Sequence, residues 1–393
     1  MSNYRLIILL SFGHLVTDIN QGALPAILPF LISEYQLTYS AGAAIIFAAN
    51  SASAIVQPFF GYLADRLNRP WLIPIAILIA GFGMGLTGFM KSYALIIMLA
   101  VASGIGIAAF HPQAARLVNF AGAAKKGTSM SFFGLGGTLG FAIGPILATT
   151  AIITMGLKGT SLLIIPVLLV SVLLFSQLPR FNKLELDVKD TKNQSQEILK
   201  IDRWAPFTLL SFIIIGRSIT FYGLNTFIPL YWIGFFNESI AQGGVALSMI
   251  AISGVFGNIF GGWLSDKIGY KKMIITGFLC LSIFLPLFIM INHPMVALLS
   301  LCPIGFVLAA TYSPTIVLGQ EYLPNRVGFS SGVTLGLSVV FGGIAAPFIG
   351  IIADNKGIWS AIAVVASFPV FTFFLSLFLP APEVRVSQGK FRG

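Results

Sequence analysis

The fold of this chain is indicated by one sequence pattern that occurs twice. The two copies are GYLADRLNR, at residues 61–69, and GWLSDKIGYKK, at residues 262–272. In each, a glycine is followed four residues later by an aspartate and then by basic residues, and the two glycines lie 201 positions apart. The same offset relates further glycines: Gly22 with Gly223, Gly42 with Gly243, Gly104 with Gly305, and Gly127 with Gly328. Two apolar halves repeated in parallel are typical of secondary transporters, whose substrates pass between the halves.

The composition indicates a membrane protein. Of the 393 residues, 56% are apolar and only 9% are charged, with a mean hydropathy of +0.92. A soluble domain carries about 25% charged residues, so this chain needs lipid as its solvent. We therefore expect an integral membrane protein.

Twelve segments are apolar enough and long enough to span a bilayer as helices, which takes about 20 residues each. They are residues 6–33, 41–64, 71–90, 93–118, 128–153, 160–178, 205–236, 241–265, 272–291, 294–321, 328–353 and 358–379. Together with the repeat, they predict an all-α membrane protein with twelve transmembrane helices in two parallel-repeat six-helix bundles. In the fifth segment, Gly136, Gly140 and Gly144 share one face, which predicts close contact with another helix.

The domain organisation follows from the single long polar stretch. Residues 1–178 form the predicted N-terminal bundle, residues 179–203 a cytoplasmic linker, and residues 204–393 the C-terminal bundle with a short cytoplasmic tail. We interpret the linker as a solvated tether without a site of its own.

The charge distribution sets the predicted orientation. The formal net charge is +10, but 18 of the 23 Lys and Arg residues fall at one predicted membrane face. Lys91, Lys158 and Lys356 fall at the other face, and Arg116 and Arg217 lie within helices. The positive-inside rule then places both termini in the cytoplasm. The basic charge reflects topology, so we expect no nucleic-acid partner.

The repeated aspartates predict a gate. An aspartate at a helix end can accept hydrogen bonds from the exposed amides of a neighbouring helix N-terminus and offset its positive dipole. Adjacent basic residues can pair across the two bundles, so such contacts would form when the cytoplasmic side closes and break when it opens. The alternative is a solvated turn that carries topology-setting charges. The predicted gating residues are Asp65, Arg66, Arg69, Asp266, Lys267 and Glu321.

The two repeated loops resemble the cytoplasmic signature of the major facilitator superfamily, with Asn68 in place of the usual glycine. The chain also resembles the fosmidomycin-resistance branch of that superfamily, in segments spread over almost its whole length. These are GHLVTDI (13–19), QPFFGY (57–62), FHPQAAR (110–116), GRS (216–218), NTFIPLY (225–231) and QEYLPNRVG (320–328). The resemblance implies an inner-membrane efflux protein driven by proton exchange. It carries over His14, Asp18, His111, Arg116, Arg217 and Glu321 as functional residues.

The sequence departs from this pattern at two positions. Gln113 stands where the branch usually has a glutamate, and Ala100 stands where many proton-linked exporters of the superfamily place an arginine. A membrane carboxylate is therefore missing at position 113.

Asp18 is the one carboxylate predicted well inside the hydrocarbon region, where polar groups are costly and face a cavity. His14, Thr17, Asp18 and Gln21 follow the spacing i, i+3, i+4, i+7 and share one helix face. Burial favours the neutral carboxyl and a nearby cation favours the charged one, so a balanced group can load and release a proton. We predict that Asp18, helped by His14, couples transport to protons. The alternative is a permanently paired aspartate that braces the first helix.

The predicted substrate contacts centre on Arg217, whose guanidinium suits a carboxylate or phosphate. The alternative is that Arg217 pairs with Asp18 or with helix carbonyls. Gln57 and Asn258 are counterparts under the 201-residue offset, as are His111 and Tyr312. His111 could instead be a satisfied core histidine, and Arg116 could extend to the membrane surface. The full predicted set is Gln21, Gln57, His111, Gln113, Arg116, Arg217, Tyr222, Asn225, Asn258 and Tyr312.

These features predict a secondary active transporter, a proton-coupled antiporter that exports a small amphipathic or anionic compound. The alternative within transport is uptake or facilitated diffusion of a small organic anion or metabolite, and the alternative class is a membrane enzyme or receptor. The chain lacks a phosphate-binding loop for ATP, and its three histidines, far apart in sequence, form no metal motif. We expect a monomer whose partners are a small-molecule substrate, protons and lipid, with no metal or cofactor.

Overall fold

The structure is a computed structural model that describes residues 3–37, 39–67, 69–123, 125–194 and 201–381. Every regular element in this part of the chain is a helix, as the sequence predicted. The elements are α1 (Tyr4–Tyr35), α2 (Tyr39–Leu67), α3 (Leu72–Gly85), η1 (Thr87–Phe89), α4 (Tyr93–Gly122), α5 (Lys126–Met155), η2 (Leu157–Leu163), α6 (Ile164–Ser176), α7 (Leu178–Gln194), α8 (Trp204–Gly234), α9 (Ile240–Ile268), α10 (Tyr270–Phe288), α11 (Pro294–Ala310), α12 (Tyr312–Tyr322), α13 (Val327–Lys356) and α14 (Ile358–Leu377).

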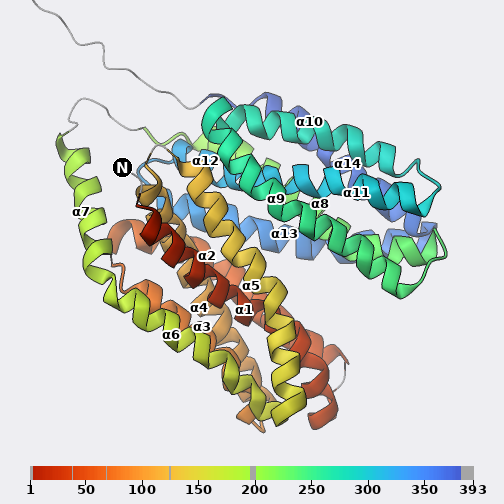
Figure 1. Cartoon of the computed structure of the whole chain (residues 1–393), viewed down its shortest axis with the longest axis horizontal. Helices are drawn as coiled ribbons and strands as arrows, with labels where there is room; N and C mark the ends of the chain where they lie inside the picture. Colours follow the sequence, from red (N-terminus) through yellow and green to blue (C-terminus); the bar gives the residue numbers. More distant parts are fainter. Residues whose placement is uncertain (1–2, 38, 68, 124, 195–200, 382–393) are drawn as a thin grey trace, which may run out of the picture.

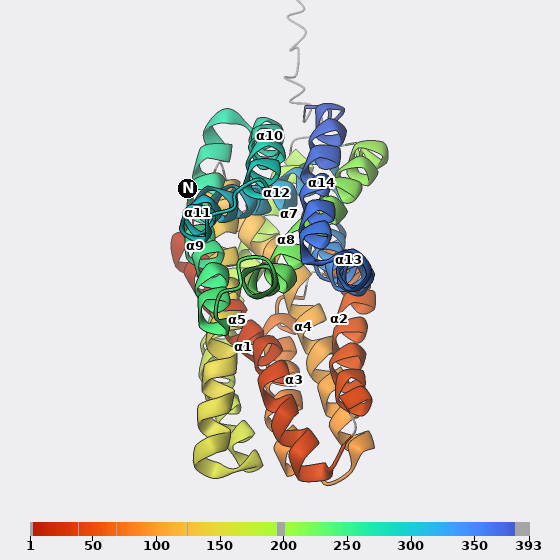
Figure 2. The ribbon, with the colours of Figure 1, turned by 90° about the vertical axis from the view of Figure 1, so that its right-hand side faces the viewer.

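The helices form two bundles, α1–α6 and α8–α14, which meet near α12 and the start of α1 and diverge toward the far end of α5 (Figure 1). The view turned by 90° shows one bundle stacked on the other (Figure 2). The second bundle has an apolar core of its own. The core of the first bundle continues across the meeting point, where Ile316, Val317 and Leu335 of the second bundle join it.

Eleven of the described helical segments are long and apolar enough to cross a membrane. The predicted first span, α1, has 32 residues and so is long enough to cross a membrane, but it is not among these eleven. With α1 the bundles hold the twelve predicted spans. The predicted span 294–321 is broken at Thr311 into α11 and α12.

The polar face of α1 is held by α5. Gly136, Gly140 and Gly144 lie against α1, and a side chain at any of them would overlap a backbone oxygen of that helix. This close approach confirms the contact that their spacing predicted, and it fixes α1 beside α5 and α4 at the depth of Asp18.

The predicted solvated linker is largely a helix. Residues 178–194 form α7, in which the side chains of Phe181 and Glu185 are buried, so this segment is docked on the protein. The sequence does not reveal this docking, because α7 is polar on average and only part of one of its faces is buried. Residues 195–200 of the linker, Asn68 and residues 382–393 of the predicted tail lie outside the described residues.

Candidate functional site

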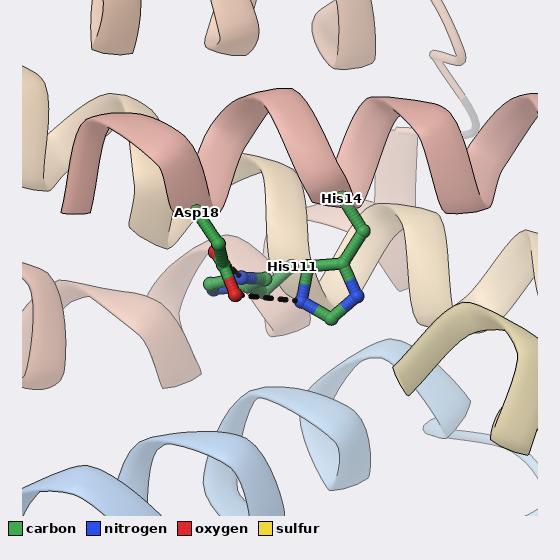
Figure 3. A group of neighbouring side chains, drawn as sticks. All are labelled: His14, Asp18 and His111. Carbon is green, nitrogen blue, oxygen red and sulfur yellow. Dashed lines mark hydrogen bonds and ion pairs between the residues drawn. The ribbon is translucent and has the colours of Figure 1, made fainter. Parts of the chain in front are cut away.

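His14, Asp18 and His111 come together between α1 and α4 (Figure 3). Asp18 Oδ2 lies 3.2 Å from His14 Nε2, and Asp18 Oδ1 lies 3.1 Å from His111 Nε2. The His14–Asp18 contact is the one that the spacing i, i+4 predicted. His111 joins this contact from α4, although it lies 93 residues from Asp18 in the sequence.

The hydrogen bonds of His14 determine where a proton must lie. Its Nδ1 is 2.7 Å from the carbonyl oxygen of Phe133, and a carbonyl only accepts, so Nδ1 carries a hydrogen. In a neutral ring, Nε2 then presents a lone pair toward Asp18. Two acceptors at 3.2 Å would repel, so the contact requires a further proton, either on Nε2 or on the carboxyl of Asp18.

Gly137 of α5 provides the space for this pair. A Cβ at this position would lie 2.5 Å from His14 Nε2 and 2.7 Å from Asp18 Oδ2. The ring of His14 also stacks on Phe133, with ring centroids 4.1 Å apart. Helix α5 therefore covers the cluster on one side and orients the imidazole.

The ligand atoms of His14, Asp18 and His111 all lie within 4.8 Å of one another. Separation in sequence did not predict that two of the three histidines would share a site. The group offers three protein ligand atoms, as a catalytic zinc site does, and one fewer than a closed structural zinc site has. Its contacts are those of an acid–base cluster.

The second bundle presents a buried cation. Arg217 of α8 donates from Nε to Thr311 Oγ1 at 3.1 Å and from Nη2 to the Leu308 carbonyl at 3.3 Å. Its guanidinium carbon lies 4.8 Å from the ring centre of Tyr312. No ion pair joins Arg217 to an acid among the described residues. The predicted alternative of bonds to helix carbonyls is partly realised, and pairing with Asp18 is not.

Tyr222 and Tyr312 both lie within electrostatic range of Asp18 and of Arg217. Asn225, by contrast, uses its amide on the carbonyl of Phe221 within its own helix.

The other predicted substrate residues of the first bundle are dispersed. Gln21 lines a cavity just large enough for one water, together with Asn50 and Ser103. Gln57 and Gln113 are both buried, and neither Nε2 has a hydrogen-bond partner among the described residues.

Asn258, the counterpart of Gln57, lies in the contact between the bundles. Its side-chain oxygen accepts from Ser313 at 2.9 Å, and its backbone oxygen accepts from Ser131 of the first bundle at 2.7 Å. Asn258 therefore contributes to the contact between the bundles.

The helix-terminus contacts predicted for the two repeated aspartates are present where the bundles meet. We call the contact of Asp65 the first latch, that of Asp266 the second latch, and this region the latch end. Backbone N–H groups of Gly328 and Phe329, at the start of α13, donate to Asp65 at 2.8 Å each. Those of Gly127 and Thr128, at the start of α5, donate to Asp266 at 2.7 and 2.8 Å. Every member of one set is 201 residues from its counterpart.

Arg116, predicted to bind substrate or to extend to the membrane surface, belongs instead to the first latch. Its Nε lies 3.3 Å from Asp65 Oδ1, and its Nη1 donates to Glu185 Oε1 of α7. Sequence reasoning missed Glu185, because its linker was predicted to be solvated. Burial raises the pKa of the Glu185 carboxyl above its ordinary value, although Arg116 partly opposes this.

Within the described part of the chain, the basic residues of the repeated loops form no ion pair across the bundles, unlike the predicted pairing. The Arg66 guanidinium lies over the Tyr62 ring at 4.6 Å, and Lys267 Nζ lies over Trp263 at 3.7 Å, each within its own helix. Arg69 is exposed. Glu321 does reach across, to Lys126 at 3.9 Å.

One contact between the bundles was missed although the repeat contained the signal for it. Asn119 Nδ2 donates to Gln320 Oε1 at 2.6 Å, and these residues are counterparts under the 201-residue offset. A residue that touches its own counterpart lies at the pseudo-two-fold axis. Gln320 is fixed in turn by a hydrogen bond to Ser331.

Comparison with known proteins adds a family and a fold. A model of the Major Facilitator Superfamily matches residues 10–335. The chain is 28% identical over 374 residues to the fosmidomycin resistance protein of Escherichia coli (strain K12), covering 94% of this chain and 91% of that protein. It is 27% identical over 395 residues to an uncharacterized MFS-type transporter of Bacillus subtilis (strain 168), covering 97% and 94%. A crystal structure of the transporter FucP in the outward conformation matches the fold with a TM-score of 0.75 at 16% identity, covering 96% and 98%.

Proposed function

The chain belongs to the Major Facilitator Superfamily and is a membrane transport protein rather than an enzyme; from this premise we propose that it is a proton-coupled antiporter that exports a small amphipathic or anionic compound by alternating access. The observation that carries the proposal is the proton required between His14 and Asp18. The name of the Escherichia coli relative, a fosmidomycin resistance protein, supports export.

The cluster has the properties of a proton-coupling site. The titratable groups that face Asp18 are His14 on α1, His111 on α4, Tyr222 on α8 and Tyr312 on α12. With the proton present, the His14–Asp18 contact is a charge-assisted or neutral hydrogen bond. Without it, two acceptors face each other and the contact opens. Loss of the proton therefore changes the packing of α1 against α4 and α5.

Arg217 supports an anionic group on the substrate. A buried guanidinium without an acidic partner is costly unless an anion binds to it. Its planar fork suits a carboxylate or a phosphonate, and the two tyrosines could donate hydrogen bonds to the same ligand. Protons would then bind at the Asp18 cluster in the first bundle, and the charged group of the substrate would bind at Arg217 in the second bundle.

The latches support alternating access. We assign the latch end to the cytoplasm, because it carries the start of α1 and the basic loops of both halves. Both termini are then cytoplasmic in an inner-membrane protein. With both latches formed, the protein is closed on that side, and substrate release to the outside would require no change at the latches.

Uptake of an organic anion together with a proton is the second candidate, and one observation favours it. Protonation of the cluster removes negative charge near Arg217, so it strengthens anion binding instead of opposing it. Proton and anion would then bind together, which is the logic of symport.

Transport in proteoliposomes tests both candidates, with fosmidomycin as the probe and an imposed pH gradient. An antiporter accumulates the probe in vesicles with an acidic interior, whereas a symporter accumulates it in vesicles with an acidic exterior. Asp18→Asn should lower gradient-driven flux at least 100-fold and retain probe binding. Asp354→Asn, at an exposed site, is the matched control and should transport normally. Gradient-driven flux that survives in Asp18→Asn would contradict the assignment of Asp18.

A further inference from the structure

A groove lies on the outer surface of the first bundle at the latch end, between the start of α1 and the junction of α6 with α7. It has a volume of about 200 Å³. It is separate from the transport site and from both latches. Its lining consists of Arg5, Leu6, Leu9, Leu173, Gln177 and Arg180.

The two walls of the groove change from apolar to basic in the same direction. On α1, Arg5 lies one turn, about 6 Å, nearer the latch end than Leu9. On the other wall, Leu173, Gln177 and Arg180 follow the spacing i, i+4, i+7, so Arg180 lies about 10 Å beyond Leu173. Because α1 and α6 run in opposite directions, both basic ends lie at the surface and both apolar ends lie in the membrane. This gradient matches an amphiphile with a polar head and an apolar chain.

The positive charge of the groove favours an anionic ligand. Two of its six lining residues are arginines and none is acidic. Arg180 Nη1 donates to Gln177 Oε1 at 2.7 Å, which orients the guanidinium and leaves its other N–H groups for a ligand. The nearest acidic residue along α7, Glu185, is engaged with Arg116 instead. Guanidinium groups bind phosphate through paired N–H donors.

We propose that this groove binds an anionic phospholipid, with the headgroup phosphate between Arg5 and Arg180 and an acyl chain along Leu9 and Leu173. Leu173 is 53% exposed on the membrane-facing side of α6, so an acyl chain can reach it from the bilayer. Anionic lipids concentrate in the cytoplasmic leaflet, where the basic loops are placed. This site goes beyond the proposed transport function and rests on it only for the cytoplasmic assignment of the latch end.

Lipid retention by the purified full-length protein in detergent tests the site by native mass spectrometry. The probes are dioleoyl phosphatidylglycerol, dioleoyl phosphatidylcholine and inorganic phosphate. We expect phosphatidylglycerol to bind at least tenfold more tightly than phosphatidylcholine. The double variant Arg5→Gln/Arg180→Gln should lose this preference. Lys183→Gln/Lys272→Gln, which removes two exposed charges outside the groove, should keep it.

A second variant separates a lipid from a free anion and does not alter charge. Leu173→Trp fills the apolar part of the groove at an exposed position, so it should fold normally and weaken phosphatidylglycerol binding about tenfold. Equal binding of the two lipids, or a preference that survives Arg5→Gln/Arg180→Gln, would overturn the proposal. Displacement of phosphatidylglycerol by inorganic phosphate, with Leu173→Trp binding lipid normally, would identify a phosphate site instead.

Discussion

The two latches have the same geometry and different surroundings. In both, an aspartate at the end of one helix accepts two backbone N–H groups at the start of a helix in the other bundle. Asp65 is additionally paired with Arg116, which reaches α7 through Glu185. Asp266 instead accepts from the hydroxyls of Thr128 and Tyr270, at 2.7 and 2.9 Å. The repeat fixes the backbone contact, and each half adds its own partner.

The centre of the molecule shows the same division more strongly. His111 and Tyr312 are counterparts, but the first bundle carries the acid–base cluster and the second carries Arg217. The positions equivalent to Asp18 and Arg217 are Ile219 and Val16, which bear no charge. The repeat therefore gives two similar helical bundles, whereas the charged residues at the centre of the molecule differ between the two halves.

Removal of the latch aspartates should have the largest effect on the closed form. Asp65→Ala leaves the buried Arg116 with one acid fewer, so we expect the closed form to lose about 3 kcal/mol. Asp266→Ala leaves only neutral N–H and O–H donors without their acceptor, so we expect the closed form to lose about 1.5 kcal/mol of stability. The readout is the labelling rate of Ser331→Cys, buried at the latch end, by a membrane-impermeant thiol reagent.

Labelling should rise about 100-fold for Asp65→Ala and about tenfold for Asp266→Ala. The background should carry Cys280→Ser and Cys302→Ser, and Asp354→Asn is the control for loss of an acid. Equal increases for the two latch variants would show that Arg116 and Glu185 add nothing to the first latch.

Substitution of the latch glycines should give a smaller effect that is equal in the two halves. A Cβ at Gly61 would overlap the backbone oxygen of Gly328, and one at Gly262 would overlap that of Gly127. We expect Gly61→Ala and Gly262→Ala each to destabilise the closed form by about 1 kcal/mol, measured by the same labelling. Gly350→Ala, where a Cβ meets nothing within 4 Å, should change labelling little. A tenfold difference between the two latch glycines would mean that the shared backbone contact is not equivalent.

Periodicity and the repeat predicted the features that depend on local spacing. The spans, the two latch aspartates and the His14–Asp18 pair all follow from residues that are near in sequence or related by one fixed offset. The roles of His111 and Arg116 depend on how α4 packs against its neighbours, which helical spacing does not determine. The sequence does not reveal that Arg116 pairs with Glu185, because Glu185 lies in a segment whose mean polarity conceals one buried face. Asn119 and Gln320 could have been found by asking which counterparts meet on the axis.

The smallest expected effect concerns Glu185, which contacts Arg116 of the first latch and has no equivalent at the second latch among the described residues. Burial raises the pKa of Glu185 in the folded protein above its unfolded value of about 4.5, so the folded state binds more protons between these two values. The contribution of Glu185 to stability is then complete below pH 4.5 and is lost as the pH rises through the folded pKa. Glu185→Gln should abolish this part of the pH dependence.

The measurement is the thermal unfolding midpoint of the wild type and of Glu185→Gln between pH 4 and pH 7. The wild type should lose stability relative to the variant as the pH rises, by less than the glycine substitutions cost. Asp354→Asn, which removes an exposed acid, should run parallel to the wild type. If Glu185→Gln also runs parallel, the carboxyl titrates as it does in the unfolded chain, and Arg116 offsets its burial fully. A relative gain in wild-type stability with rising pH would mean that Arg116 dominates, and that α7 is held to the first latch mainly by the ion pair.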